Sequence, residues 1–222
     1  MKYIVHASHF AVLFTLAILS GIAQTPSRGH GSKGVLWVPP VINLPDEHPG
    51  PGVRREMIGR LRVGSVPIIL NETSRAAAQK ALGGTVGIQG DAGDWEAWLC
   101  YQGHNAKGRW MLWLLSSEVD NENVSGLQWT QLSPAEAADH RCKLISGNNT
   151  VRLPDTLKLG MSAAAVRQVL GEPTLVSGNL LEYSHEHHQT IDQLDYTVAN
   201  DVNLVLESGK VRSIQVWRSV IN

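Results

Sequence analysis

The run His185-Glu186-His187-His188 is the densest group of residues in this chain that could do chemistry. On a β-strand alternate side chains share a face, so His185 and His187 would lie together and could bind one metal ion through imidazole nitrogens. The sequence offers no identifiable third ligand, and the spacing is not the H-E-x-x-H pattern of zinc enzymes. A solvated strand end is the alternative. We therefore predict no metal site and no cofactor, and a small metal-dependent hydrolase ranks last among the functions considered.

The other candidate catalytic residues are serines and aspartates. Ser116, Ser117 and Ser208 are predicted at strand ends or turns with no identifiable base, and no G-x-S-x-G nucleophile elbow occurs. Asp91 and Asp94 could pair as carboxylates for acid–base work, but their Gly-Asp surroundings are typical of a loop. We predict that the chain is not an enzyme.

The N-terminus has the layout of a secretory signal. An apolar run, HFAVLFTLAIL, is followed by small residues at Gly21 and Ala23, which predicts cleavage after Ala23. The run is about half of the roughly 20 apolar residues that a membrane helix needs. We predict a signal peptide over 1–23, no membrane span, and a mature protein that is periplasmic or secreted.

The charges of the chain nearly balance, with 19 Lys and Arg against 20 Asp and Glu. Removing Lys2 with the signal leaves 18 against 20, a net charge of −2. A near-neutral chain has no electrostatic basis for binding nucleic acid or an anionic membrane surface. We predict neither as a partner; the expected partner, on the grounds given below, is another envelope or secreted protein.

The two cysteines, Cys100 and Cys142, form an even pair in a chain predicted to be exported, which favours a disulfide. Closing a loop of about 40 residues would stabilise the fold by roughly 4 kcal/mol in the chain-entropy model. The alternative is two buried free thiols.

The segment LGMSAAAVRQVLGEP predicts a short helix with a defined start and end. Ser162 can accept a hydrogen bond from the first turn, Gly171 suits the left-handed position after the helix, and Pro173 forbids continuation. Such a short helix is unstable alone and must pack on something. Three strand-like runs follow, LLEYSHE, DVNLVLES and KVRSIQVW, and the last two alternate apolar with polar residues. They predict an antiparallel sheet with one wet face.

The same order of elements occurs earlier in the chain. Ser74 stands nine residues before Gly83, as Ser162 stands nine before Gly171, and three strand-like runs follow. We predict two tandem helix-plus-sheet units, over 57–132 and 151–222. A Pro/Gly-rich arm or linker, 24–56, precedes them, and its apolar part could dock on the folded units.

Residues 133–150 are predicted to form a connecting helix and loop between the units. Ser133, Pro134 and Glu136 match the first positions of a capping box. A helix here would bring Cys142 back toward Cys100.

The second unit resembles the SmpA/OmlA (BamE-like) domain family. The resemblance rests on these residues: Leu157, Leu159, Gly160, Met161, Ser162, Val166, Leu170, Gly171, Pro173, Tyr183, Gly209, Lys210 and Val211. The tandem arrangement resembles that of β-lactamase-inhibitory-protein-like proteins. The resemblance implies an α+β fold with two tandem units, each a short helical hairpin packed on an antiparallel β-sheet. It also implies a non-catalytic role in binding other proteins.

Five of the seven tryptophans lie between residues 95 and 129. The separations within each predicted strand are odd, so each strand sends tryptophan to both faces of its sheet. One face must cover the helix, and the other would expose aromatic side chains, which mark interaction sites. The predicted partner-binding residues are Trp98, Trp110, Trp113 and Tyr101. The alternative is that residues 35–44 or the second unit cover them.

These observations together predict an exported, non-catalytic protein-binding module that binds its partner through an aromatic sheet face. The second function considered is an envelope assembly or scaffold factor. Cell fractionation separates these two, and a tightly bound metal would mark the hydrolase.

Overall fold

The computed structural model describes residues 34–44, 58–91, 95–117, 122–145, 151–191 and 193–221. All of these belong to one compact unit, Gly31–Asn222. The predicted signal peptide, 1–23, and most of the predicted arm outside 34–44 lie outside the described residues.

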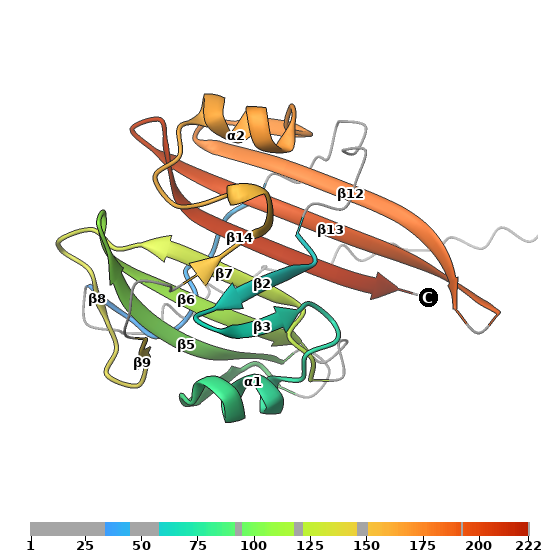
Figure 1. Ribbon diagram of the computed structural model, residues 1–222, viewed down its shortest axis with the longest axis horizontal. Helices are drawn as coiled ribbons and strands as arrows, with labels where there is room; N and C mark the ends of the chain where they lie inside the picture. Colours follow the sequence, from blue (N-terminus) through green and yellow to red (C-terminus); the bar gives the residue numbers. More distant parts are fainter. Residues whose placement is uncertain are drawn as a thin grey trace, which may run out of the picture. The chain divides into compact units, whose positions relative to one another are not determined.

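One large antiparallel sheet of nine strands organises this unit (Figure 1). Eight strands follow one another in the order β11-β12-β13-β14-β7-β6-β5-β4, and β9 pairs parallel with β5 beside β4. The bounds are β4 (Val86–Gln89), β5 (Glu96–Asn105), β6 (Gly108–Ser117), β7 (Gly126–Gln131), β9 (Lys143–Leu144), β11 (Leu175–Ser177), β12 (Leu180–Ile191), β13 (Leu194–Glu207) and β14 (Lys210–Ile221).

Smaller elements complete the fold. A three-stranded sheet has the order β10-β2-β3, and a parallel pair joins β1 to β8. Their bounds are β1 (Val35–Leu36), β2 (Arg60–Val63), β3 (Val66–Ile69), β8 (Ala137–Ala138) and β10 (Val151–Arg152). The described helical elements are α1 (Arg75–Leu82), α2 (Ala163–Leu170) and the 3₁₀ turn η2 (Pro154–Thr156).

The main core lies between one face of the large sheet and the layer that α1, α2 and the three-stranded sheet form. Figure 1 shows α2 beside β12 and α1 beside β5. The core joins side chains from both halves of the large sheet to the inner face of the three-stranded sheet. Its fully buried members include Leu61, Ile68, Leu112, Leu127, Tyr183, Val202 and Ile214.

Both helices begin and end where the sequence predicts. The hydroxyl of Ser74 accepts a hydrogen bond from the Ala77 N–H at 3.1 Å, and that of Ser162 accepts one from Ala165 at 3.2 Å. Gly171 has φ of 90° as expected, but its ψ of −165° places it in a region that essentially only glycine adopts, rather than in the left-handed helical region.

The predicted fold class, α+β with a helical hairpin in each unit, is wrong. Among the described residues the protein is mostly β, and each half contributes a single α-helix of eight residues. The halves also share one sheet, because β14 pairs with β7 in antiparallel register over Ser213–Trp217. The order helix, short strand and three longer strands does occur in both halves, as α1-β4-β5-β6-β7 and α2-β11-β12-β13-β14.

The predicted connecting helix after Ser133 does not form. The capping-box contact exists, since Glu136 Oε2 accepts from the Ser133 N–H at 2.7 Å. The next residues, Ala137 and Ala138, instead pair with β1, and Arg212 holds Glu136 from another strand at 2.8 Å. Tertiary contacts override the local helix signal here. Residues 146–150 lie outside the described residues.

Candidate functional site

The four predicted partner-binding residues, Trp98, Trp110, Trp113 and Tyr101, are all buried, with 2 % or less of their surface exposed. Trp98 and Trp113 lie on one face of the sheet, and Trp110 and Tyr101 lie on the other. The predicted exposed aromatic face is therefore wrong, because both faces are covered at these positions. Strand alternation separates the two faces, but it does not show what lies against each.

On the helix side, the aromatic residues are part of the main core. Trp110 packs edge-on against Trp129, with ring centres 6.4 Å apart. The Tyr101 hydroxyl donates to the Gly83 carbonyl at 3.1 Å, and burial raises the pKa of this hydroxyl well above its usual value. Tyr101 thus ties β5 to the end of α1, which is a structural role.

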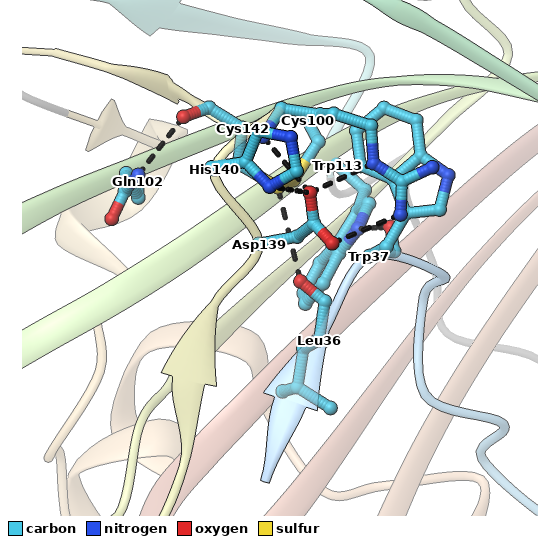
Figure 2. A network of polar contacts seen from close by, with 9 residues as sticks. Leu36, Trp37, Cys100, Gln102, Trp113, Asp139, His140 and Cys142 are labelled. Atoms are coloured by element: carbon cyan, nitrogen blue, oxygen red, sulfur yellow. Dashed lines mark hydrogen bonds and ion pairs between the residues drawn. A yellow bond between two sulfur atoms is a disulfide. The ribbon is translucent and has the colours of Figure 1, made fainter. Parts of the chain in front are cut away.

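On the opposite side, residues 34–44 cover the tryptophans, and we call this segment the arm. Trp37 packs edge-on against Trp98 with ring centres 5.8 Å apart. Trp113 Nε1 donates to the Trp37 carbonyl at 2.9 Å, as Figure 2 shows. Gln128 Nε2 donates to the Pro40 carbonyl at 2.9 Å. The alternative in which this segment covers the aromatic residues is the one that the structure shows.

The predicted disulfide between Cys100 and Cys142 is present and buried. It joins β5 to the segment before β9, and Gln102 Nε2 donates to the Cys142 carbonyl at 2.9 Å beside it (Figure 2). The described residues contain no free cysteine.

An ion pair next to the disulfide holds the arm from outside. Arg141 Nε donates to Asp139 Oδ1 at 2.7 Å, and the Arg141 guanidinium lies 4.2 Å from the centre of the Trp37 ring. Hydrogen bonds from Arg141 hold the pKa of the Asp139 carboxyl well below its usual range. Asp139 N also donates to the Leu36 carbonyl at 2.9 Å. The network of Figure 2 therefore positions the arm against the large sheet.

The predicted chemical candidates do not meet in one place. The His185 and His187 rings lie 5.4 Å apart on β12, and within the described ranges no group of three or more His, Cys, Asp or Glu side chains could hold a metal ion. Ser116 is buried, and Ser208 lies between β13 and β14 with φ of 49°. Asp91 is exposed, and Asp94 lies outside the described residues.

The feature that sequence reasoning missed is the open outer edge of β12, from Tyr183 to Thr190. The strand pairs with β13 along all 12 of its residues, but β11 covers only Leu180–Glu182 on its other side. In the part of the chain that the structure describes, no other strand pairs with this edge. The histidine run lies in this segment. The sequence signal was present, since LVSGN predicts only a very short strand before β12.

Two hydrogen bonds establish which backbone groups point outward from β12. The Ser184 N–H donates to Thr174 Oγ1, away from β13, at 3.0 Å, whereas the Asn179 carbonyl accepts from Leu206 of β13 at 2.7 Å. Because backbone groups alternate between the two sides of a strand, Glu186, His188 and Thr190 direct their N–H and C=O groups to the open edge. All three residues are exposed.

The opposite side of the large sheet ends in two short strands, β4 and β9. There β5 pairs with β4 over Glu96–Leu99 and with β9 over Tyr101–Gln102. The disulfide at Cys100 lies between these two pairings. Open edges invite pairing with another chain, and proteins usually shield them with prolines, lysines or bulges. The exposed part of β12 has none of these, since its ladder with β13 runs without a register shift.

Comparison with known proteins found no match to any family model, curated protein or solved structure. In the described residues the protein is thus mostly β, and most of the outer edge of β12 is not covered by another strand. The resemblance to the SmpA/OmlA family stays a prediction. No helix in the described ranges is long and apolar enough to cross a membrane.

Proposed function

We propose that this chain is an exported, non-catalytic binding module that takes up an extended segment of another envelope or secreted protein along the open edge of β12. The single observation that supports this most strongly is the bulge-free outer edge of β12 at Glu186, His188 and Thr190, with which no described strand pairs. The disulfide and the signal-like N-terminus support an exported location.

Strand addition is the recognition mode that suits such an edge. An extended peptide gains main-chain hydrogen bonds from the outward groups of Glu186, His188 and Thr190, and its alternate side chains reach the two sheet faces. Side chains of this stretch offer selectivity: His185 and His187 lie on one face and His188 lies on the other. His188 Nδ1 is 3.2 Å from Thr197 Oγ1, so its ring is already oriented. The rigid β12–β13 ladder reduces the ordering cost of binding.

The test compares prolines placed at outward and inward positions of β12. Glu186→Pro and His188→Pro each remove an N–H that points to the open edge, which an edge strand tolerates. His187→Pro is the matched control, because it removes a donor to β13. Wild type and each variant are used to capture partners from envelope and secreted fractions, and the unfolding midpoint of each is measured.

The proposal expects a partner that wild type retains and that both outward variants lose, while their unfolding midpoints stay close to wild type. His187→Pro should instead lower the midpoint. Retention of every captured protein by folded Glu186→Pro and His188→Pro would overturn the proposal. A wild-type chain that pairs only with a second copy of itself along β12 would do the same. Fractionation of the bound partner then separates a free binding protein from an assembly factor.

A further inference from the structure

A cleft of about 560 Å³ lies on the outer side of the three-stranded sheet, away from the β12 edge and from the arm. Its polar lining includes three arginines, Arg60, Arg62 and Arg152, against one carboxylate, Asp155. The whole chain has a net charge of −1, so this concentration of positive charge is local. A volume of this order is typical of small-ligand sites, which range from about 300 to 1,000 Å³.

The alternation of β2 places these arginines on the outer face. Leu61 and Val63 are buried in the core, whereas Arg60 and Arg62 are exposed between them. In the sheet register Arg152 of β10 lies directly opposite Arg62. Side chains in that relation have Cβ atoms about 5 Å apart, and like charges there destabilise a sheet.

Two of the three arginines, Arg60 and Arg62, are not neutralised by other described residues. Arg152 and Asp155 each have an interaction within the chain. Among the described residues neither Arg60 nor Arg62 forms an ion pair. Their guanidinium groups therefore retain donors that match the planar or tetrahedral oxygens of a carboxylate or phosphate.

The remaining lining of the cleft is apolar and open to solvent. Pro67 lies opposite Arg62, and Ile69, which is 41 % exposed, lies opposite Arg60. Pro154 of η2 lines the cleft as well. The next two residues, Asp155 and Thr156, have positive φ values of 53° and 61°, a strained conformation for residues other than glycine.

We propose that this cleft binds a small organic anion. Arg62 holds its carboxylate or phosphate group, Arg60 contacts the same group or a second one, and Pro67, Ile69 and Pro154 contact its apolar part. This site is independent of the proposed partner site on β12.

The test uses titration calorimetry at about 0.1 M salt with three probes: phenyl phosphate, inorganic phosphate and phenol. Phenyl phosphate carries both the anionic group and an apolar ring, and the other two probes each carry one. Poly-glutamate is the comparison for an acidic polypeptide. The variants are Arg62→Ala, Arg62→Lys and Arg60→Ala. Lys80→Ala is the control, since it removes one exposed positive charge on α1 outside the cleft.

The proposal expects phenyl phosphate to bind wild type at least about tenfold more tightly than inorganic phosphate or phenol. Arg62→Ala should weaken this binding by about tenfold or more, the loss of one charge-assisted hydrogen-bonded pair. The affinity of Arg62→Lys for phenyl phosphate should lie between those of wild type and Arg62→Ala, because lysine keeps the charge without the paired donors. Lys80→Ala should bind as wild type does.

Three results would overturn the proposal. One is an equal loss in Lys80→Ala, which would show that only net charge matters. The second is phenyl phosphate binding that Arg62→Ala and Arg60→Ala leave unchanged, or no binding of phenyl phosphate at all. The third is binding of poly-glutamate alone, which would assign the cleft to an acidic polypeptide. Because Arg60 and Arg62 are exposed, the unfolding midpoints of the variants should stay near wild type, which keeps each result interpretable.

Discussion

At the residue scale, two glycines make room for large rings in the sheet. Gly103 lies opposite Trp110, and Gly87 lies opposite Trp98. A Cβ atom on Gly103 would lie 2.0 Å from a Trp110 ring carbon, and one on Gly87 would lie 2.2 Å from Trp98. Real carbon atoms do not approach this closely. Each tryptophan ring therefore occupies the space beside its neighbour only because that neighbour is glycine. Sequence alternation identified the tryptophans as sheet residues but did not show this pairing.

Gly103→Ala should therefore destabilise the protein by about 1 to 3 kcal/mol through overpacking. Chemical denaturation measures the change. The double variant Gly103→Ala/Trp110→Leu should lose less free energy of unfolding than the sum of the losses in the two single variants, because the smaller side chain relieves the clash. Additive losses would contradict the contact.

The ion pair of Glu136 with Arg212 makes a pH-dependent contribution. The two side chains are 24 % and 28 % exposed, and their N–O distance is 2.8 Å. Burial alone would raise the pKa of Glu136, but the hydrogen bond from Ser133 and the contacts of Arg212 outweigh it and lower the pKa. A lowered folded-state pKa gives stability that is present above the unfolded value, about 4.3, and is lost as the pH falls through the folded value.

Glu136→Gln should accordingly cost about 1 kcal/mol at pH 7, and the difference from wild type should shrink below about pH 4. Unfolding midpoints across that range measure it. A difference that grows on acidification would contradict the sign of the pKa shift.

At the scale of elements, the helices were predictable from local signals and the connecting segment was not. Ser74, Ser162 and Gly171 act on neighbours within one turn, so their positions alone indicate where the helices begin and end. Ser133 and Glu136 give an equally good local signal and even make the predicted contact. That segment forms strand because the arm pairs with Ala137 and Ala138, a contact with residues about 100 positions earlier.

Gly171→Ala should destabilise the protein by about 1 to 3 kcal/mol, since φ of 90° with ψ of −165° is strained for any side chain. A new Cβ would meet no atom within 4 Å, so the cost is conformational and not steric. Thermal or chemical unfolding measures it. The substitution Glu172→Ala, at the exposed neighbouring residue, should change the free energy of unfolding by no more than about 0.5 kcal/mol. Equal effects of the two substitutions would contradict a strained backbone at Gly171.

The arm can be tested through Trp37, which contacts Trp98, Trp113 and Arg141. Trp37→Ala should destabilise the protein by about 2 to 4 kcal/mol, because it opens the cover over two buried rings. Tryptophan fluorescence should shift to longer wavelength as these rings meet water. Val41→Ala is the control, since Val41 is 85 % exposed on the same segment. An unchanged spectrum in Trp37→Ala would contradict the arm contact.

At the scale of the whole molecule, the strands and turns of each half could be predicted, but their joining could not. The β7–β14 pairing links Thr130 to Ser213, whose hydroxyls lie 2.7 Å apart across the sheet. Alternation within a strand carries no information on which distant strand lies beside it. The same limit explains the aromatic residues, because the sequence did not show that the arm covers Trp98 and Trp113. The edge of β12 is different, since the shortness of β11 could be predicted from the local sequence.

The disulfide restrains this arrangement over a sequence separation of 42 residues. Replacing both Cys100 and Cys142 by Ala should cost about 4 kcal/mol, the loop-closure value for that separation. Denaturation of this variant and of wild type, each with and without reductant, measures the difference. Reductant should lower the free energy of unfolding of wild type but not that of the variant. Equal free energies of unfolding for the two proteins without reductant would contradict a restraining role.

If the open edge of β12 is a binding surface, amide hydrogen exchange will detect its occupation. In the free protein the outward N–H groups of Glu186, His188 and Thr190 should exchange quickly, while those of His185, His187 and Gln189 should be protected by β13. With the captured partner bound, the three outward groups should become protected and the inward three should change little. Outward groups that exchange as quickly in the complex as in the free protein would contradict a binding role for this edge.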